Sequence, residues 1–354
     1  MSKKIKLVFL TLLVYGIPIL LWSYIPFSKN LWGSFTSSFL FNFLFNGEKI
    51  FVPMGIIFDL LLLYCFFILF FKKNISFEKE RVYLIYSGAK KIIKWIFVEK
   101  IKTELLISKE EKVSLLFYLV KLYFAPVMLK FLINNITSLI NSFSAISVLH
   151  KTTSGNLTPK VITNVYFSLI LYIILVLDTL IFAFGYFFES SKLKNIVKSV
   201  EPTALGWLVA VACYPPINSL TGDVLGWYTS DFGDFGSINI NIAMGVLSLL
   251  LFAIYLWASI ALGFKASNLT NRGIVSRGPY KYVRHPAYAS KNLSWWIMGI
   301  PFINRYGLIA VVSLMAWTFM YFLRALTEEK HLGQDPDYVE YSKKVKYMFI
   351  PGLF

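Results

Sequence analysis

Three polar clusters near the C-terminus carry the side chains best suited to chemistry. They read GPYKYVRHPAY over residues 278–288, RALTEE over 324–329 and YVEYSKKVK over 338–346. Aromatic faces attract cations, an arginine fork binds carboxylates, and carboxylates accept hydrogen bonds from amino and hydroxyl groups. The clusters therefore combine the groups that would hold a small molecule bearing charges of both signs.

The apolar segments between these clusters should bring them to one surface. Residues 287–303 and 306–326 predict a tight helical hairpin that begins and ends at the same side of a membrane. The second helix of that hairpin would return Glu328 and Glu329 to the level of Arg284. Gly278-Pro279 and His285-Pro286 predict rigid turns that expose backbone groups.

Composition indicates an integral membrane protein. The chain is 57% hydrophobic and only 15% charged, with a mean hydropathy of +0.63, whereas about 25% charged residues is usual in soluble domains. Its net charge of +16 is typical of nucleic-acid binding or of a cytoplasmic membrane surface, and the apolar runs favour the membrane surface and exclude nucleic acid. Two cysteines and three scattered histidines predict neither a disulfide framework nor a metal site.

The predicted fold is an all-α polytopic bundle with about eight membrane helices and both termini cytoplasmic. The expected spans are the apolar runs at about 7–27, 50–71, 113–136, 161–187, 203–220, 240–264, 287–303 and 306–326. Loop charge supports this count, because residues 221–239 hold three aspartates and no lysine or arginine. Residues 72–112 predict a basic amphipathic helix on the cytoplasmic leaflet, with a partner-binding helix as the alternative. We divide the chain into an N-terminal helical region, 1–160, and a core, 161–354.

The order of the three clusters resembles the isoprenylcysteine carboxyl methyltransferase and phospholipid methyltransferase family of integral-membrane enzymes. The resemblance covers roughly the last third of the chain. It implies S-adenosylmethionine as the cofactor and a lipid-like or prenylated substrate entering from the membrane, with the active site at the cytoplasmic face. Methyl transfer is an in-line displacement that needs positioning and electrostatics rather than a covalent intermediate.

The resemblance also assigns roles to residues. It implies that His285, Pro286, Tyr288 and Glu329 line the cofactor site, and the tyrosines at Tyr280, Tyr338 and Tyr341 suit the sulfonium. It implies further that Arg284, Glu328 and a basic residue of the C-terminal tract, which we take as Lys344, act in catalysis by orienting the acceptor's anionic group.

The C-terminal tract departs from the prenylcysteine enzymes, because Lys343, Lys344 and Lys346 stand where those enzymes have an arginine. Lysine cannot form the bidentate fork. The acceptor therefore stays open among a carboxylate, a phosphate, an amine and a thiol. The alternative function from another class is a transporter or channel that uses the intramembrane groups Lys121, Lys130 and Asp178.

Overall fold

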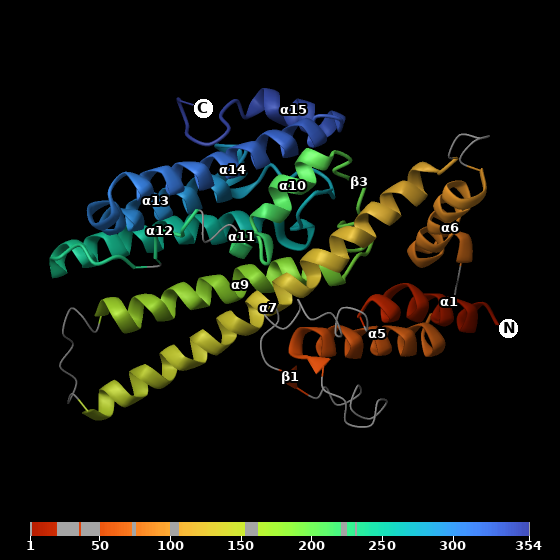
Figure 1. Cartoon of the computed structure of the whole chain (residues 1–354), viewed down its shortest axis with the longest axis horizontal. Helices are drawn as coiled ribbons and strands as arrows, with labels where there is room; N and C mark the ends of the chain where they lie inside the picture. Colours follow the sequence, from red (N-terminus) through yellow and green to blue (C-terminus); the bar gives the residue numbers. More distant parts are fainter. Residues whose placement is uncertain are drawn as a thin grey trace. The chain divides into compact units, whose positions relative to one another are not determined.

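The computed structural model describes residues 2–19, 35–36, 50–72, 76–99, 106–152, 162–220, 225–230 and 232–353. These residues form mostly helices, together with two short two-stranded antiparallel sheets (Figure 1). The predicted all-α class is therefore confirmed apart from these few strand residues. The chain divides into two compact units, Met1–Pro126 and Val127–Phe354.

The described residues of the first unit form three helices, one small sheet and the first part of α7 (Lys109–Thr152). Their bounds are Lys3–Thr11 for α1, which continues as a π-helix over Leu12–Gly16, Val52–Phe70 for α5, and Arg81–Lys94 for α6, which continues as a π-helix over Trp95–Glu99. A 3-10 turn spans Phe77–Lys79, and β1 (Phe35–Thr36) pairs with β2 (Ile50–Phe51). Leu10 and Val14 pack against Val82 and Ile85, so α1 is fastened to α6.

The amphipathic character predicted for residues 72–112 appears in α6. Val82 and Ile85 are buried in the core of the first unit, whereas Ile93 is 57% exposed and Phe97 is 81% exposed. Large apolar side chains left open beside lysines are what a helix lying on a membrane surface would present. Its position on the cytoplasmic leaflet stays a prediction, and residues 100–105 lie outside the described part of the chain.

The second unit holds roughly the C-terminal two thirds of the chain. α7 spans Lys109–Thr152 and contains Pro126, so its first part belongs to the first unit. The remaining bounds are Ile162–Phe167 for a π-helix that leads into α9 (Ser168–Phe187), Ser199–Val200 for β3, Ala204–Ala212 for α10, Ile217–Leu220 for α11, Ile238–Leu262 for α12, Thr270–Asn271 for β4, Pro286–Tyr306 for α13, Leu308–Leu332 for α14 and Pro336–Lys344 for α15. Short 3-10 turns span Gly263–Lys265 and Gly278–Lys281.

Within this unit α12 is central. It packs against α9 on one side and against α13 on the other, and α13 packs against α14 (Figure 1). The approach of α9 to the turn after α12 is close enough to require glycine, because a β-carbon at Gly185 would overlap the carbonyl oxygen of Ala266. These contacts bring the ends of α9, α12 and α14 to the place where the polar clusters meet.

Four helices of the described residues are long and apolar enough to cross a membrane: Lys109–Val148, Val165–Phe187, Ile238–Lys265 and Leu308–Leu332. A shorter apolar helix spans Ile56–Phe70. These helices establish the integral-membrane class, since about 20 apolar residues span the hydrocarbon core. They do not confirm the predicted count of eight, and the side on which the termini lie stays a prediction.

Two differences from the predicted spans have clear physical reasons. The run 203–220 is one of the predicted spans but is broken, as its two prolines predict, since α10 ends at Ala212 and Pro215-Pro216 separates it from the single turn of α11. The run 287–303 forms α13, but Lys291 and Asn292 make this helix less apolar than the four candidates. Residues 20–27 of the first predicted span lie outside the described part of the chain.

The loop between α9 and α10 is fixed against the segment that follows α12. Ser199 and Val200 of β3 pair with Asn271 and Thr270 of β4. Asn195, which is fully buried, donates its amide to the carbonyl oxygen of Phe188 at 2.7 Å. These bonds bring the loop to one wall of the cavity described next.

Candidate active site

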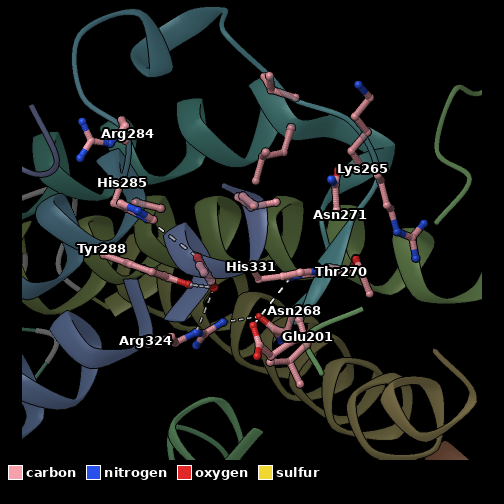
Figure 2. A pocket seen from close by; sticks show the side chains of 18 of the residues that line it. Glu201, Lys265, Asn268, Thr270, Asn271, Arg284, His285, Tyr288, Arg324 and His331 are labelled. Atoms are coloured by element: carbon pink, nitrogen blue, oxygen red, sulfur yellow. Dashed lines mark hydrogen bonds and ion pairs between the residues drawn. The ribbon is translucent and has the colours of Figure 1, made fainter. Parts of the chain in front are cut away.

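A cavity of about 200 Å³ lies where the ends of α9, α12 and α14 meet (Figure 2). Its described lining holds seven tyrosines, two histidines, five cationic side chains and two carboxylates. The charged and histidine residues are Lys265, Arg272, Arg284, Lys291, Arg324, His285, His331, Glu201 and Glu328. A cavity rich in aromatic faces with a few charges of both signs suits a zwitterionic or cationic ligand.

The pair Arg284–Glu329 joins the first polar cluster, at the start of α13, to the second, at the end of α14. Arg284 binds both oxygens of Glu329, with Nε donating at 2.6 Å and Nη2 at 3.1 Å. His285 Nε2 lies 3.2 Å from the same carboxylate. The Arg284 guanidinium is held charged, because the bond to Glu329 outweighs the opposing effect of burial and raises its pKa. Glu329 thus sits behind the cavity wall as the partner of Arg284 and His285.

Arg284 and His285 also fasten the residues that follow α15. The Nη1 group of Arg284 donates to the carbonyl oxygens of Val345 and Lys346 at 2.9 Å and 2.7 Å. The backbone N–H groups of Arg284 and His285 donate to Tyr347 and Met348 at 3.0 Å and 2.8 Å. Together with its two bonds to Glu329, the Arg284 guanidinium therefore makes four hydrogen bonds with protein acceptors.

Tyr288, Glu328 and Arg324 form a second group, and this group faces the cavity. The Tyr288 hydroxyl donates to Glu328 Oε1 at 2.5 Å, and Arg324 Nε lies 3.5 Å from the same oxygen. Arg324 also donates to the side-chain oxygen of Asn268, and its guanidinium lies 5.2 Å from the Tyr288 ring centre and 5.5 Å from that of Tyr214. Arg324 is almost fully buried, so its charge is compensated by Glu328 and by two aromatic faces.

A further group of polar residues comes from the loop before α10 and from α14. His331 Nε2 lies 2.9 Å from the Ser199 hydroxyl, and Nδ1 lies 3.9 Å from Glu201. Glu201 accepts the backbone N–H and the hydroxyl of Thr203, at 2.9 Å and 2.5 Å. Thr203 in turn caps α10 by accepting from the N–H of Gly206. This network fixes one cavity wall to the end of α14.

Three tyrosines cover the side of the cavity next to α15. Tyr338 and Tyr341 are buried with Val345, and Tyr280 packs against them. The Tyr341 hydroxyl donates to the backbone oxygen of Tyr280 at 2.8 Å. Burial raises the pKa of all three phenols. They are therefore neutral at physiological pH and present aromatic faces or hydroxyl donors.

Most of the residues predicted from the sequence come together here. Those that line the cavity are Tyr280, Arg284, His285, Tyr288, Glu328, Tyr338 and Tyr341. Pro286 is instead buried as the first residue of α13 and is absent from the lining. Lys344 is also absent from it, because it points away on an exposed face and pairs with Glu340 at 2.5 Å.

Some lining residues were not predicted. Arg324 follows from a helical rule, since it stands one turn before Glu328 on α14. Glu201 and Asn268 gave no comparable signal, because their place depends on the β3–β4 pairing. Among the described residues, no group of three or more histidine, cysteine or acidic side chains is arranged to bind a metal ion.

The intramembrane groups behind the transporter alternative have different surroundings, and Asp178 is the one bonded to residues of the cavity. The Asp178 carboxylate accepts hydrogen bonds from Tyr255 at 2.8 Å and Ser259 at 2.5 Å, and both of these donors also line the cavity. Lys121 lies over the ring of Phe117 in the first unit, whereas Lys130 belongs to the second. Asp178 therefore lies behind two residues that line the same cavity as the polar clusters.

The fold and the site define an integral membrane protein with a charged, aromatic cavity at the ends of its helices. Comparison with protein-family models matches residues 246–334 to the isoprenylcysteine carboxyl methyltransferase (ICMT) family. This match confirms the resemblance drawn from the sequence and runs from α12 to the end of α14. It gives no support to the transporter alternative. No curated protein matches the chain.

Proposed function

We propose that this protein is a membrane methyltransferase that moves a methyl group from S-adenosylmethionine to a lipid-like substrate. The observation that carries the proposal is the cavity that the family-matched segment lines in large part, at which the Arg284–Glu329 and Tyr288–Glu328–Arg324 clusters meet. Methyl transfer needs a site that orients two molecules and balances charge. The cavity's chemistry meets both needs.

The residues present fit the cofactor. Its sulfonium would lie against the tyrosine faces, its amino group and ribose hydroxyls would reach Glu328 or Glu201, and its carboxylate needs a cation or N–H donors. When bound, S-adenosylmethionine supplies an electrophilic methyl group. Tyr280, Tyr338 and Tyr341 would exclude water from that group, because they close the side of the cavity next to α15.

We assign different roles to the two cationic clusters. Arg284 acts as a positioning residue, since its donors hold Glu329 and the carbonyl oxygens of the segment after α15. Arg324 is the cation that faces the cavity, and together with Glu328 it would orient the polar group of the acceptor. The catalytic role predicted for Lys344 needs a movement of α15, because its ammonium pairs outside the cavity.

The proposal places the active site at the cytoplasmic face, with lipids of the surrounding membrane as the source of the acceptor. The distribution of lysine and arginine supports this side. A reporter fused to the C-terminus should report a cytoplasmic position, and one inserted after Gly236 should report the opposite side. A cytoplasmic signal from the reporter after Gly236 would contradict the proposed topology.

Two experiments test the function. Purified full-length protein should bind S-adenosylhomocysteine with micromolar affinity in calorimetry, and a Lys192→Ala control, which changes an exposed lysine away from the cavity, should bind equally well. Incubation with methyl-labelled S-adenosylmethionine and a total lipid extract should then give a labelled lipid whose mass identifies the acceptor. Absence of binding by folded protein would overturn the proposal and revive the transporter alternative.

A further inference from the structure

Lys265 stands out among the charged residues that line the cavity. It lies at the end of α12, in the 3-10 turn Gly263–Lys265, and is half-buried. Arg284 and Arg324 each face a glutamate, at 2.6 Å and 3.5 Å. Among the described residues, Lys265 has neither a hydrogen bond nor an ion pair. A half-buried ammonium without a carboxylate is costly unless a ligand compensates it.

The charges around Lys265 are mostly of its own sign. The ammonium of Lys265 is repelled by three cations, Lys198, Arg277 and Lys194, and is attracted by one acid, Asp337. Lys265 Nζ and Lys198 Nζ both approach the point that a β-carbon on Gly273 would occupy, at 3.1 Å and 3.9 Å. Gly273 has a φ of +92°, so glycine both permits this turn and leaves the space open.

The nearby carboxylates are already engaged. Asp335 and Asp337 lie 3.3 Å and 3.4 Å from the Lys198 ammonium. Asp335 also accepts from the Asn271 amide at 2.8 Å. These acids therefore compensate Lys198 and leave Lys265 facing an open, positively charged end of the cavity. Like charges held together in this way favour an anion.

We propose that this end of the cavity is a phosphate subsite that binds a phosphate group carried by the methyl acceptor, with Lys265 as its central donor. The inference rests on the proposed function, because it assumes that the cofactor and the acceptor share the cavity. A phosphate fits better than a carboxylate, since several cations converge and a phosphate can carry two negative charges. The ammonium of Lys265 would act as a point charge on that group.

The position of the subsite favours the acceptor over the cofactor's carboxylate. Figure 2 shows Lys265 beside Asn271 and across the pocket from Arg284 and Tyr288. Lys198, which is half exposed, lies beside Gly273, which lines this end of the cavity. A lipid acceptor could place its phosphate beside Lys265 while the group that receives the methyl extends toward Arg324.

The test compares two short-chain lipids that differ in one group. Dihexanoyl phosphatidic acid and neutral dihexanoylglycerol are titrated into full-length protein in a nonionic detergent and followed by calorimetry. The wild type should bind the phosphatidic acid at least about tenfold more tightly. Lys265→Gln should remove most of that preference, whereas Lys265→Arg should keep it. Lys192→Ala removes an exposed lysine that does not line the cavity and should leave the preference unchanged, which would exclude general surface charge as its cause.

Each other outcome has a definite meaning. An unchanged preference in a folded Lys265→Gln variant would overturn the subsite. Weaker S-adenosylhomocysteine binding by that variant, with phosphatidic acid binding intact, would assign Lys265 to the cofactor's carboxylate and overturn the assignment to the acceptor. Wild-type protein that binds phosphatidic acid through Lys265 but not S-adenosylhomocysteine would refute the methyltransferase and leave the subsite standing. The reverse result would refute the subsite alone.

Discussion

Arg284→Lys should release the segment that follows α15. Arginine makes four side-chain hydrogen bonds here, two to the Glu329 carboxylate and two to the carbonyl oxygens of Val345 and Lys346. An ammonium can keep one contact with the carboxylate but cannot reproduce the fork. Each charge-assisted bond contributes about 1.5–3 kcal/mol, and water offsets part of the loss, because the two side chains are 13% and 20% exposed.

We therefore expect the attachment of this segment to weaken by about 2–3 kcal/mol, which is roughly 30- to 150-fold in the population of the detached form. Trypsin can measure that population, because Lys343, Lys344 and Lys346 lie at the attachment and cleavage follows the open fraction when opening is fast. Cleavage should accelerate by that factor, and S-adenosylhomocysteine affinity should fall with it. Arg277→Lys is the matched control, since the Nε of Arg277 donates a single bond to the Ala261 carbonyl oxygen.

Two results would refute this reasoning. Unchanged cleavage together with unchanged cofactor affinity would mean that the fork contributes little to the attachment. Slower methyl transfer with both measurements unchanged would instead place Arg284 at the reacting atoms, as the sequence alone predicted.

Three further predictions concern other parts of the second unit. Gly185→Ala should sharply lower the thermal unfolding midpoint, although alanine normally stabilises a helix by about 1 kcal/mol, because its methyl group would overlap the Ala266 carbonyl oxygen; an unchanged midpoint would contradict that close approach. Tyr288→Phe removes the donor to Glu328 and should weaken S-adenosylhomocysteine binding about three- to tenfold, with equal binding as the contrary result. Asp335 has a lowered pKa, because hydrogen bonds from its neighbours outweigh the effect of burial. Its contribution to stability should be complete above about pH 5 and should decline as pH falls through that lowered pKa. Asp335→Asn should therefore flatten the acid limb of a stability–pH curve, and a curve parallel to that of the wild type would refute the contribution of Asp335.

The sequence predicted the parts of this structure that follow from long apolar runs and from order along the chain. A hairpin that leaves and re-enters one surface must bring Arg284 close to Glu328 and Glu329, and the structure pairs Arg284 with Glu329. The break of the run 203–220 was also visible, because Tyr214 is followed by two prolines, although a full span was predicted there.

Other features depend on tertiary contacts that leave little trace in the sequence. β3 and β4 are two residues each, too short for any periodic pattern, so the contribution of Glu201 to the cavity could not be anticipated. The position of Lys344 was within reach of a helical argument. Tyr338 and Tyr341 lie one turn apart on α15 and are buried with Val345, whereas Glu340 and Lys344, which are also one turn apart, are exposed and pair with each other.

The cavity walls and the family-matched segment do not have the same boundaries. Glu201 and Tyr214 line the cavity from before residue 246, and Tyr338 and Tyr341 cover it from after residue 334. An excised 246–334 fragment would therefore lack two sides of its own binding site. Proteins could also diverge in the molecule they accept through substitutions in these flanking walls while the matched segment stays the same. Grouping such proteins by acceptor therefore requires comparison of the flanking loops as well as of the shared motif.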